Sequence, residues 1–216
     1  MKSIVMVALG LTFIFIVSCG GLRPLAPGSI GSTSTGWDIK ALDVARGVNY
    51  LTDVEKDVIL ELNKVRTNPK KYAELYIKPL PKSADVQECV EVLSKANSIG
   101  ILTPEKGLYL AAKDHATDQS KTGQTGHDGS DGSHASDRIK RYGDSKGMRA
   151  ETISYGKNTG RDIVTQLLVD AGVPSRGHRK IIMDGTHTKV GTSVKTHPKY
   201  GHLCVTDYAQ SYISNK

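Results

Sequence analysis

Helical periodicity dominates the first half of this chain, whereas strand-like alternation appears only towards its end, and this order limits the folds open to it. Apolar residues recur at helical intervals between Val54 and Val65. Roughly alternating segments follow much later, at Val190–Val194 and Leu203–Tyr208, with a shorter strand expected at Glu151–Tyr155. Helices first and strands late predict an α+β domain built in layers.

Capping and proline signals mark where the expected helices begin and end. Thr52 and Glu55 have the spacing of a capping box, and Asn68-Pro69 ends that helix and opens the next. Glycine and several small polar residues make 123–133 a loop. The other expected boundaries are a third helix capped by Ser83, a fourth beginning at Thr103-Pro104, a short one from Ser136 to Tyr142, one ending at Ala171-Gly172, and a short one from Ser175 to Met183.

The first 18 residues have the layout of a secretory signal peptide. Lys2 is followed by an apolar run from Ile4 to Val17, which is too short for a typical spanning helix. The run ends in Ile16-Val17-Ser18-Cys19-Gly20, which resembles a bacterial lipobox, so Cys19 is expected to become the lipidated first residue of the mature chain. Ordinary cleavage near Cys19 without a lipid is the alternative. Either outcome predicts an exported protein, as a cell-envelope lipoprotein or a secreted one.

Residues 19–50 are expected to form a flexible tether, and residues 51–216 a single folded domain. The first part of this stretch is rich in Gly, Ser, Thr and Pro and has almost no apolar period. Trp37 either docks on the domain or stays in the loose linker. The formal net charge is +7, but the Lys and Arg residues are scattered and do not alternate with aromatic residues, which argues against nucleic-acid binding.

Three cysteines are too few for a disulfide scaffold. If Cys19 carries a lipid, Cys89 and Cys204 remain as an even pair, and an oxidising compartment would allow a disulfide between them. Two separate buried thiols are the alternative, since cysteine packs well as a small apolar residue. The sequence leaves both open, because it does not give the distance between the two residues.

Two histidines and one glutamate are the residues with the clearest chemical potential. His127 stands in a glycine-rich loop, His178 lies between Gly177 and Arg179, and Glu151 lies between them in the sequence. Imidazole and carboxylate groups bind borderline metals and move protons near neutral pH. If Ser175 caps a short helix, His178 lies in its first turn. On composition alone, a surface loop histidine is the better interpretation of His127.

These residues lie in segments that together resemble the CAP superfamily, which comprises the cysteine-rich secretory proteins, antigen 5 and the pathogenesis-related 1 proteins, also called SCP domains. The resemblance runs from about Leu51 to Tyr212 and is similar to the bacterial branch. The matching segments, in order, are Gly126-His127, Ser136-Asp137-Arg138-Ile139-Lys140, Ala150-Glu151-Thr152-Ile153-Ser154-Tyr155-Gly156, Ser175-Arg176-Gly177-His178-Arg179 and Lys189-Val190-Gly191.

The resemblance implies a three-layer α-β-α sandwich with a cleft across one face. It assigns His127 and His178 as the cleft histidines and Glu151 as the glutamate of the family's Gly-Glu-Asn signature, although Ala150 and Thr152 depart from that pattern. Many relatives have a second acid on the preceding helix. Asp170 is the best positional match for it, although an acid at a helix end with no further role is an equal alternative.

Two classes of function follow from this site. The first is a ligand-binding or interaction module whose cleft receives a lipid, glycan, peptide or host molecule and needs no cofactor. The second is a metal-assisted hydrolase, with His127 and His178 holding Zn²⁺ and Glu151 acting as general base. A structural envelope protein with an unused cleft is a third reading. No HExxH spacing supports the metal site.

Overall fold

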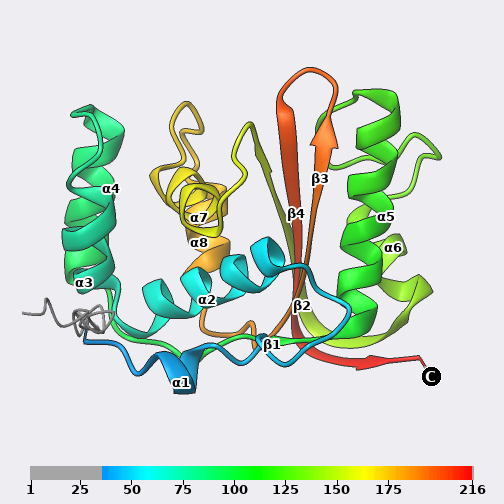
Figure 1. Cartoon of the computed structure of the whole chain (residues 1–216), viewed down its shortest axis with the longest axis horizontal. Helices are drawn as coiled ribbons and strands as arrows, with labels where there is room; N and C mark the ends of the chain where they lie inside the picture. The colour runs from blue at the N-terminus through cyan, green and yellow to red at the C-terminus, as the bar shows by residue number, and fades with distance from the viewer. Residues whose placement is uncertain (1–35, 216) are drawn as a thin grey trace, which may run out of the picture. The chain divides into compact units, whose positions relative to one another are not determined.

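The computed structural model describes residues 36–215, and within them a four-stranded sheet lies between two layers of helices (Figure 1). The strand order is β1-β3-β4-β2, with β1 parallel to β3 and the other neighbours antiparallel. β2 is therefore an edge strand. The strands are β1 (Thr103–Pro104), β2 (Gly143–Tyr155), β3 (Lys189–His197) and β4 (Gly201–Ser214).

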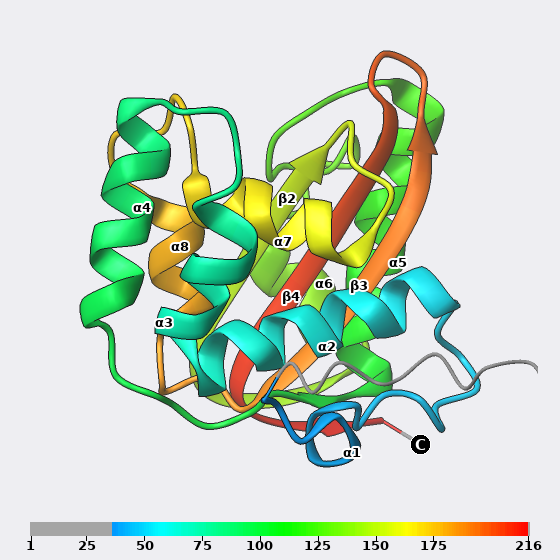
Figure 2. The same cartoon turned by 60° about the vertical axis from the view of Figure 1, so that its left-hand side comes forward.

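Helices α5 and α6 cover one face of the sheet, while α2, α7 and α8 cover the other (Figures 1 and 2). α3, the π-helix η1 and α4 pack outside this second layer. The predicted α+β, three-layer α-β-α sandwich is confirmed. The helical elements are α1 (Ile39–Leu42), α2 (Asp53–Thr67), α3 (Pro69–Tyr72), η1 (Ala73–Ile77), α4 (Ala84–Lys95), α5 (Lys106–Thr122), α6 (Ala135–Arg141), α7 (Gly160–Val169) and α8 (Gly177–Ile182).

Alternation along β4 divides the core between the two faces of the sheet. Leu203 and Val205 pack with residues of α5, whereas Cys204 and Tyr208 belong to the larger core beneath α2 and α7. α5 packs directly on the backbone of β3, because a Cβ atom added at Gly191 would lie 2.0 Å from the Tyr109 nitrogen. This close packing fixes the position of α5, which supports one side of the site described below.

The helix starts predicted from local signals are confirmed for α2, α3 and α4. The Thr52 hydroxyl accepts from the Glu55 nitrogen, and the Glu55 carboxylate accepts from the Thr52 nitrogen at 2.8 Å. Pro69 opens α3, and the Ser83 hydroxyl accepts from the Val86 nitrogen.

The helix starts predicted at three later positions are wrong. Thr103-Pro104 forms β1, since the Thr103 nitrogen donates to the Thr188 carbonyl, and α5 begins only at Lys106. α6 is capped by His134, two residues before the expected Ser136, because the His134 nitrogen donates to Asp137 at 3.0 Å. α8 follows Arg176, whose backbone is left-handed, so Ser175 does not cap it.

The expected tether is too long at its C-terminal side, because residues 36–50 belong to the folded unit. This segment forms α1 and buries Leu42 and Ala45. The Trp37 indole donates to the Lys64 carbonyl at 3.1 Å and stacks on Tyr76, so it docks on the domain. The expected signal peptide at 1–18, the lipidated Cys19 and tether residues 19–35 lie outside the described residues.

Of the two alternatives left open for Cys89 and Cys204, the structure has two buried free thiols and no disulfide between them. Cys89 is on α4, where its thiol donates to the Leu168 carbonyl of α7, whereas Cys204 lies on β4 beside Thr192. α7 lies between α4 and the sheet (Figures 1 and 2), which keeps the two thiols apart. Burial raises the pKa of each thiol to about 11, so both stay protonated and unreactive at neutral pH.

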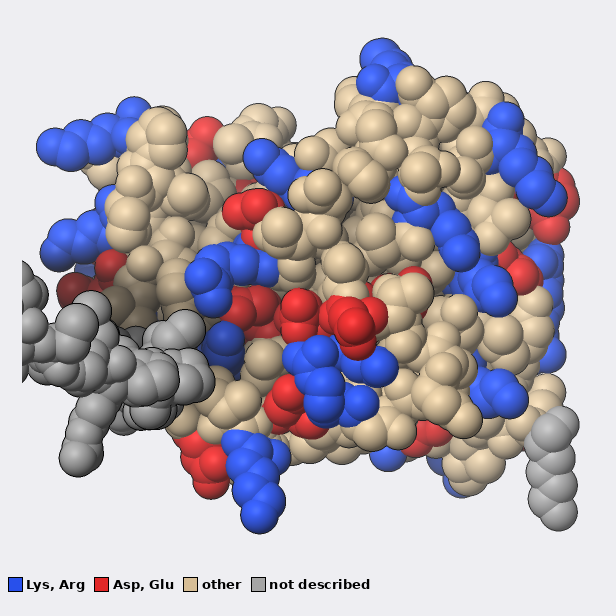
Figure 3. Space-filling model, in the orientation of Figure 1, with Lys and Arg blue, Asp and Glu red and all other residues tan. Residues whose placement is uncertain are grey.

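The surface of the described unit carries interspersed charges of both signs. Lys and Arg alternate with Asp and Glu across the face shown in Figure 3, in keeping with the scattered basic residues of the sequence. In residues 36–215, no helix has the length and apolarity needed to cross a bilayer.

Candidate functional site

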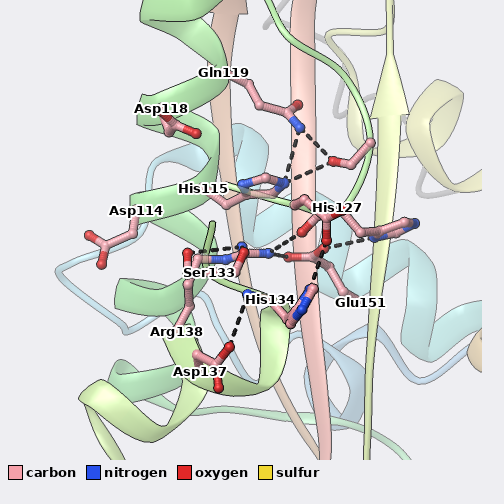
Figure 4. Close-up of polar contacts among 12 residues, drawn as sticks. Asp114, His115, Asp118, Gln119, His127, Ser133, His134, Asp137, Arg138 and Glu151 are labelled. Carbon is pink, nitrogen blue, oxygen red and sulfur yellow. Dashed lines mark hydrogen bonds and ion pairs between the residues drawn. The ribbon is translucent and has the colours of Figure 1, made fainter. Parts of the chain in front are cut away.

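His127 is held by a buried ion pair between Glu151 and Arg138 (Figure 4). Glu151 extends from edge strand β2, and one of its oxygens accepts from His127 Nδ1 at 2.8 Å. Its other oxygen accepts from Arg138 Nη2, on α6, at 2.9 Å. The Arg138 and Glu151 side chains are each 2% exposed, whereas the His127 side chain is 54% exposed. A buried pair thus orients an imidazole that faces solvent.

Arg138 also fixes the loop that carries His127. Its guanidinium donates to the His127 carbonyl at 2.9 Å and to the Ser133 carbonyl at 2.8 Å. It therefore serves both as the counter-charge of Glu151 and as the link between the two ends of the loop. For an arginine such as Arg138, a structural ion pair is commoner than a clamp on a ligand carboxylate, and the structure shows such a pair with Glu151.

Three further side chains anchor Gly126, the residue before His127. Gln119 on α5 donates to the Gly126 carbonyl at 2.6 Å, and His115 Nε2 lies 2.9 Å from the same oxygen. The Gly126 nitrogen donates to the Tyr155 hydroxyl at 3.0 Å, and that hydroxyl donates to Gln119. His115 is buried in α5 and also positions this loop. Gln119 carried no signal in the sequence, and Tyr155 belonged to a matching segment without a role of its own.

Asp207 is a buried carboxyl that sequence reasoning missed. It lies on β4 directly across from Glu151 in the strand register, and neither of its oxygens has a hydrogen-bond partner within residues 36–215. Burial, reinforced by the charge of Glu151, raises the pKa of Asp207 well above its usual range. The sequence did contain a signal for this buried carboxyl. Asp207 lies on the same face of its strand as Val205 and Ala209, which are both apolar.

Asp170 and His178 form a second histidine–acid pair. Asp170 ends α7 in a left-handed conformation, and its buried carboxylate accepts from His178 Nδ1 at 2.7 Å and from the His178 nitrogen at 3.0 Å. His178 lies in the first turn of α8, as expected. Asp170 therefore caps the N-terminus of α8 and orients the His178 imidazole, so it has a structural role beyond its place at the end of α7.

The four predicted site residues form two pairs instead of one cluster. No hydrogen bond or ion pair joins the His127–Glu151 pair to the His178–Asp170 pair within the described part of the chain. The pairs are placed on either side of edge strand β2, which contacts α6 on one side and α7 and α8 on the other. Both Glu151 oxygens are already occupied, so Glu151 is better placed to orient His127 than to act as a general base.

A cleft of about 460 Å³ opens beside the second pair. Asp170 and His178 line it together with Ile153 and Tyr155, which follow Glu151 on β2. The remainder of its wall is largely apolar and comes from the segment before α4, from α4 and from α7, including Leu80, Val86, Leu167 and Val169. The site thus combines a largely apolar wall with an oriented imidazole and several other polar side chains, among them Lys157, Asp162 and Gln166.

The two histidine–acid pairs leave one ring nitrogen of each imidazole for other partners. In both pairs the carboxylate bonds Nδ1, which leaves Nε2 as the nitrogen that could bind a metal, with the carboxylate as its outer support. His127 and His178 therefore have donor chemistry suited to zinc, which would activate a bound water. Among residues 36–215, no group of three His, Cys, Asp or Glu side chains is arranged to hold a metal ion.

The hydrogen bond that the His127 ring donates to Glu151, followed by the charge of that carboxylate, raises the pKa of His127 above its ordinary value of about 6.5. The stabilisation that this pair gives is complete below about pH 6.5 and is lost as the pH rises through the raised pKa of the folded state. We expect Glu151→Gln to lower the pKa of His127 in an NMR titration of the ring signals. Glu91→Gln, which removes an exposed partner of Lys95, serves as the control. An unchanged His127 titration in Glu151→Gln would contradict the assignment.

Comparisons with known proteins connect this geometry to a family. The model of the CAP family, described as the cysteine-rich secretory protein family, matches residues 60–208, which is more than half of the chain. No curated protein shows significant sequence similarity to this chain.

Two solved structures resemble the chain at low sequence identity. An outer surface protein from Borrelia burgdorferi is 17% identical with a TM-score of 0.48, and the match covers 73% of this chain and 95% of that one. An extracellular protein from Bacillus anthracis that contains an SCP domain is 15% identical with a TM-score of 0.43. That match covers 74% of this chain but 44% of the other, so the chain spans less than half of its length.

Proposed function

Because the chain belongs to the cysteine-rich secretory protein (CAP) family, we propose that it is an exported binding module that receives its ligand in the cleft beside β2. The observation that carries this proposal is the composition of that cleft. A largely apolar surface from the segment before α4, from α4 and from α7 surrounds His178, whose imidazole is oriented by Asp170, and polar side chains such as Asp162 and Gln166 also line the cleft. Ligand sites commonly combine apolar surface with a few fixed polar groups.

This composition favours an amphiphilic ligand over a purely polar one. Leu80, Val86 and Val169 offer apolar contact, while His178 can hydrogen-bond a polar head group through Nε2. Lys157 also lines the cleft and adds a positive charge. Among lipid, glycan, peptide and host ligands, a lipid-like molecule therefore matches this surface best.

Export and anchoring form part of the same proposal. The apolar run and the lipobox-like segment ending at Cys19 support delivery to the cell envelope. Lipidation at Cys19 would hold the domain at a membrane surface, through the residues that precede Trp37. Mass spectrometry of the N-terminal peptide from the native host tests this, because a lipidated Cys19 adds the mass of its acyl chains.

Blocking the cleft should abolish ligand binding without unfolding the domain. Ala171 is exposed and lines the cleft, so Ala171→Trp is expected to fill it. We expect about a tenfold or greater loss of lipid uptake from a lipid extract, measured by native mass spectrometry. A loss of about 1.4 kcal/mol in binding free energy lowers the affinity tenfold. Asn97→Trp, at an exposed position outside the cleft, should retain uptake. Equal uptake by Ala171→Trp and wild type would place the ligand elsewhere.

Metal-assisted hydrolysis is the alternative, and it rests on the two Nε2 atoms left available by the histidine–acid pairs. In that case, zinc dialysed into the protein should be retained by wild type and lost from a His127→Ala/His178→Ala variant in elemental analysis. His134→Ala, which removes an exposed imidazole bound to Asp128, is the matched control. Zinc retained equally by all three proteins, or peptide and ester hydrolysis that survives the double substitution, would eliminate this alternative.

A further inference from the structure

A second cavity, of about 200 Å³, lies between α5 and the loop before α6 and shares no lining residue with the cleft. Its buried part is formed by His115, Ser133 and Arg138, and its exposed rim includes Ser130, Asp131 and Arg141. Apart from one glycine, every lining residue is polar. The volume corresponds to roughly six or seven water molecules at about 30 Å³ each, and the lining excludes an apolar ligand.

Two fully buried side chains in this cavity each have a nitrogen without a partner. His115 is 0% exposed and Arg138 is 1% exposed. Within residues 36–215, His115 Nδ1 and Arg138 Nε make no hydrogen bond, although the other nitrogens of both groups are bonded. A buried polar atom left without a partner costs free energy and calls for an explanation. Both residues line the cavity, so an occupant can supply the missing bonds (Figure 4).

The two unpartnered nitrogens differ in chemistry. Arg138 Nε carries a hydrogen and can only donate. Burial lowers the pKa of His115, so its ring is neutral. His115 Nε2 lies 2.9 Å from the Gly126 carbonyl, an acceptor, and 3.0 Å from Gln119 Nε2, a donor, so Nδ1 donates or accepts according to the tautomer of the ring. The occupant must therefore accept from Arg138 and exchange a second hydrogen bond with His115, and a hydroxyl group can fill either role.

The charges around the cavity argue against an ion as the occupant. Asp118 already accepts from the Ser130 nitrogen at 2.8 Å, Asp131 from Arg141 at 2.8 Å, and Asp114 from the Tyr142 hydroxyl at 2.6 Å. Each of the three carboxylates thus already accepts a hydrogen bond from the protein, and two of them, Asp114 and Asp131, pair with Arg141. The three carboxylates would repel an anion, and no three-residue metal group occurs among the described residues.

We propose that this cavity is a binding site for a small neutral polyhydroxylated molecule, a monosaccharide or polyol. Its hydroxyl groups accept from Arg138 Nε and hydrogen-bond His115 Nδ1, while Asp114 and Ser130 at the rim contact further hydroxyls. This site is separate from the cleft proposed above, because the two share no lining residue. Variants at one site therefore test it without altering the other. Its floor residue Arg138 also holds the Glu151–His127 pair, so an occupant adjoins the back of that pair.

Saturation-transfer NMR on the full chain tests this with glucose and glycerol as neutral probes, and with glucuronate and glucosamine as anionic and cationic comparators. Ser130→Trp should obstruct the exposed rim while leaving the buried core intact, and Thr125→Trp, at an exposed position of the same loop outside the lining, is its control. We expect transfer to glucose and glycerol to fall about tenfold in Ser130→Trp, the effect of losing one or two hydrogen bonds. It should persist in Thr125→Trp.

A second readout follows the buried floor directly. In ¹⁵N-labelled protein, glucose or glycerol should shift the His115 Nδ1 resonance, since this nitrogen then gains a hydrogen-bond partner, and should leave His134 unshifted. Absence of transfer from both neutral probes would overturn the proposal and leave a hydrated cavity. Equal transfer in Ser130→Trp, an unshifted His115 nitrogen, or stronger binding of glucuronate or glucosamine than of glucose would also overturn it.

Discussion

Replacing Arg138 by methionine is expected to destabilise the folded protein by about 3–5 kcal/mol, because it leaves Glu151 as a buried charge without its cation. Arg138 and Glu151 are almost fully buried, and Asp207 lies across from Glu151 with no partner of its own. Removing the guanidinium also leaves the carbonyls of His127 and Ser133 without their donor. The loss should be measured as the free energy of unfolding in urea at neutral pH.

Two companion variants separate the buried pair from a general loss of charge. Arg141→Met removes a guanidinium that is 41% exposed and pairs with Asp131 and Asp114, so it should cost less than about 1 kcal/mol. Arg138→Met/Glu151→Gln removes both buried charges and should recover part of the loss, since the cost of an unpaired carboxylate disappears. If Arg138→Met is no less stable than Arg141→Met, the ion pair does not organise this side of the site.

The parts of the fold that were predictable from the sequence depend on interactions within one turn or one strand. The Thr52–Glu55 capping box and the helix start at Pro69 join residues a few positions apart, so spacing was enough to place them. The alternation of Leu203–Tyr208 likewise placed β4. Thr103-Pro104 was misassigned because its strand exists only through pairing with Thr188 and Val190, far along the chain.

The site shows the same division. The resemblance located His127, Glu151 and His178, and Asp170 followed from its position before α8. Their pairing did not follow, because Arg138 reaches Glu151 across the α6–β2 packing and Asp207 meets it only through the β2–β4 register. Asp170 has a left-handed backbone conformation that aims its carboxylate at His178. Residues other than glycine adopt this conformation only occasionally, so the sequence did not indicate it. Tertiary packing thus decides what the histidines contact.

The same reasoning predicts a loss of about 3–5 kcal/mol for Arg66→Met, which acts on the other side of the site. Arg66 on α2 is fully buried and donates to the carbonyls of Gly100, Ile182, Asp184 and His187, at 2.8 to 3.0 Å. Each buried carbonyl left unpaired costs about 1–3 kcal/mol. Removing the buried charge of Arg66 offsets part of the cost of the unpaired carbonyls. Burial disfavours the charged form of Arg66, as its lowered pKa indicates.

The loss of Arg66 should also affect α8, the helix that carries His178. α8 ends at Ile182, whose carbonyl accepts a hydrogen bond from Arg66 on α2. Arg66→Lys keeps the charge but has a compact head group that cannot reach all four carbonyls, so we expect an intermediate loss of stability. Arg46→Met, which removes an exposed guanidinium, should cost less than about 1 kcal/mol. Urea unfolding measures all three, and amide hydrogen exchange should show faster opening of α8 in Arg66→Met than in Arg46→Met. Unchanged exchange in α8 would mean that α7 and Asp170 hold the histidine without help from α2.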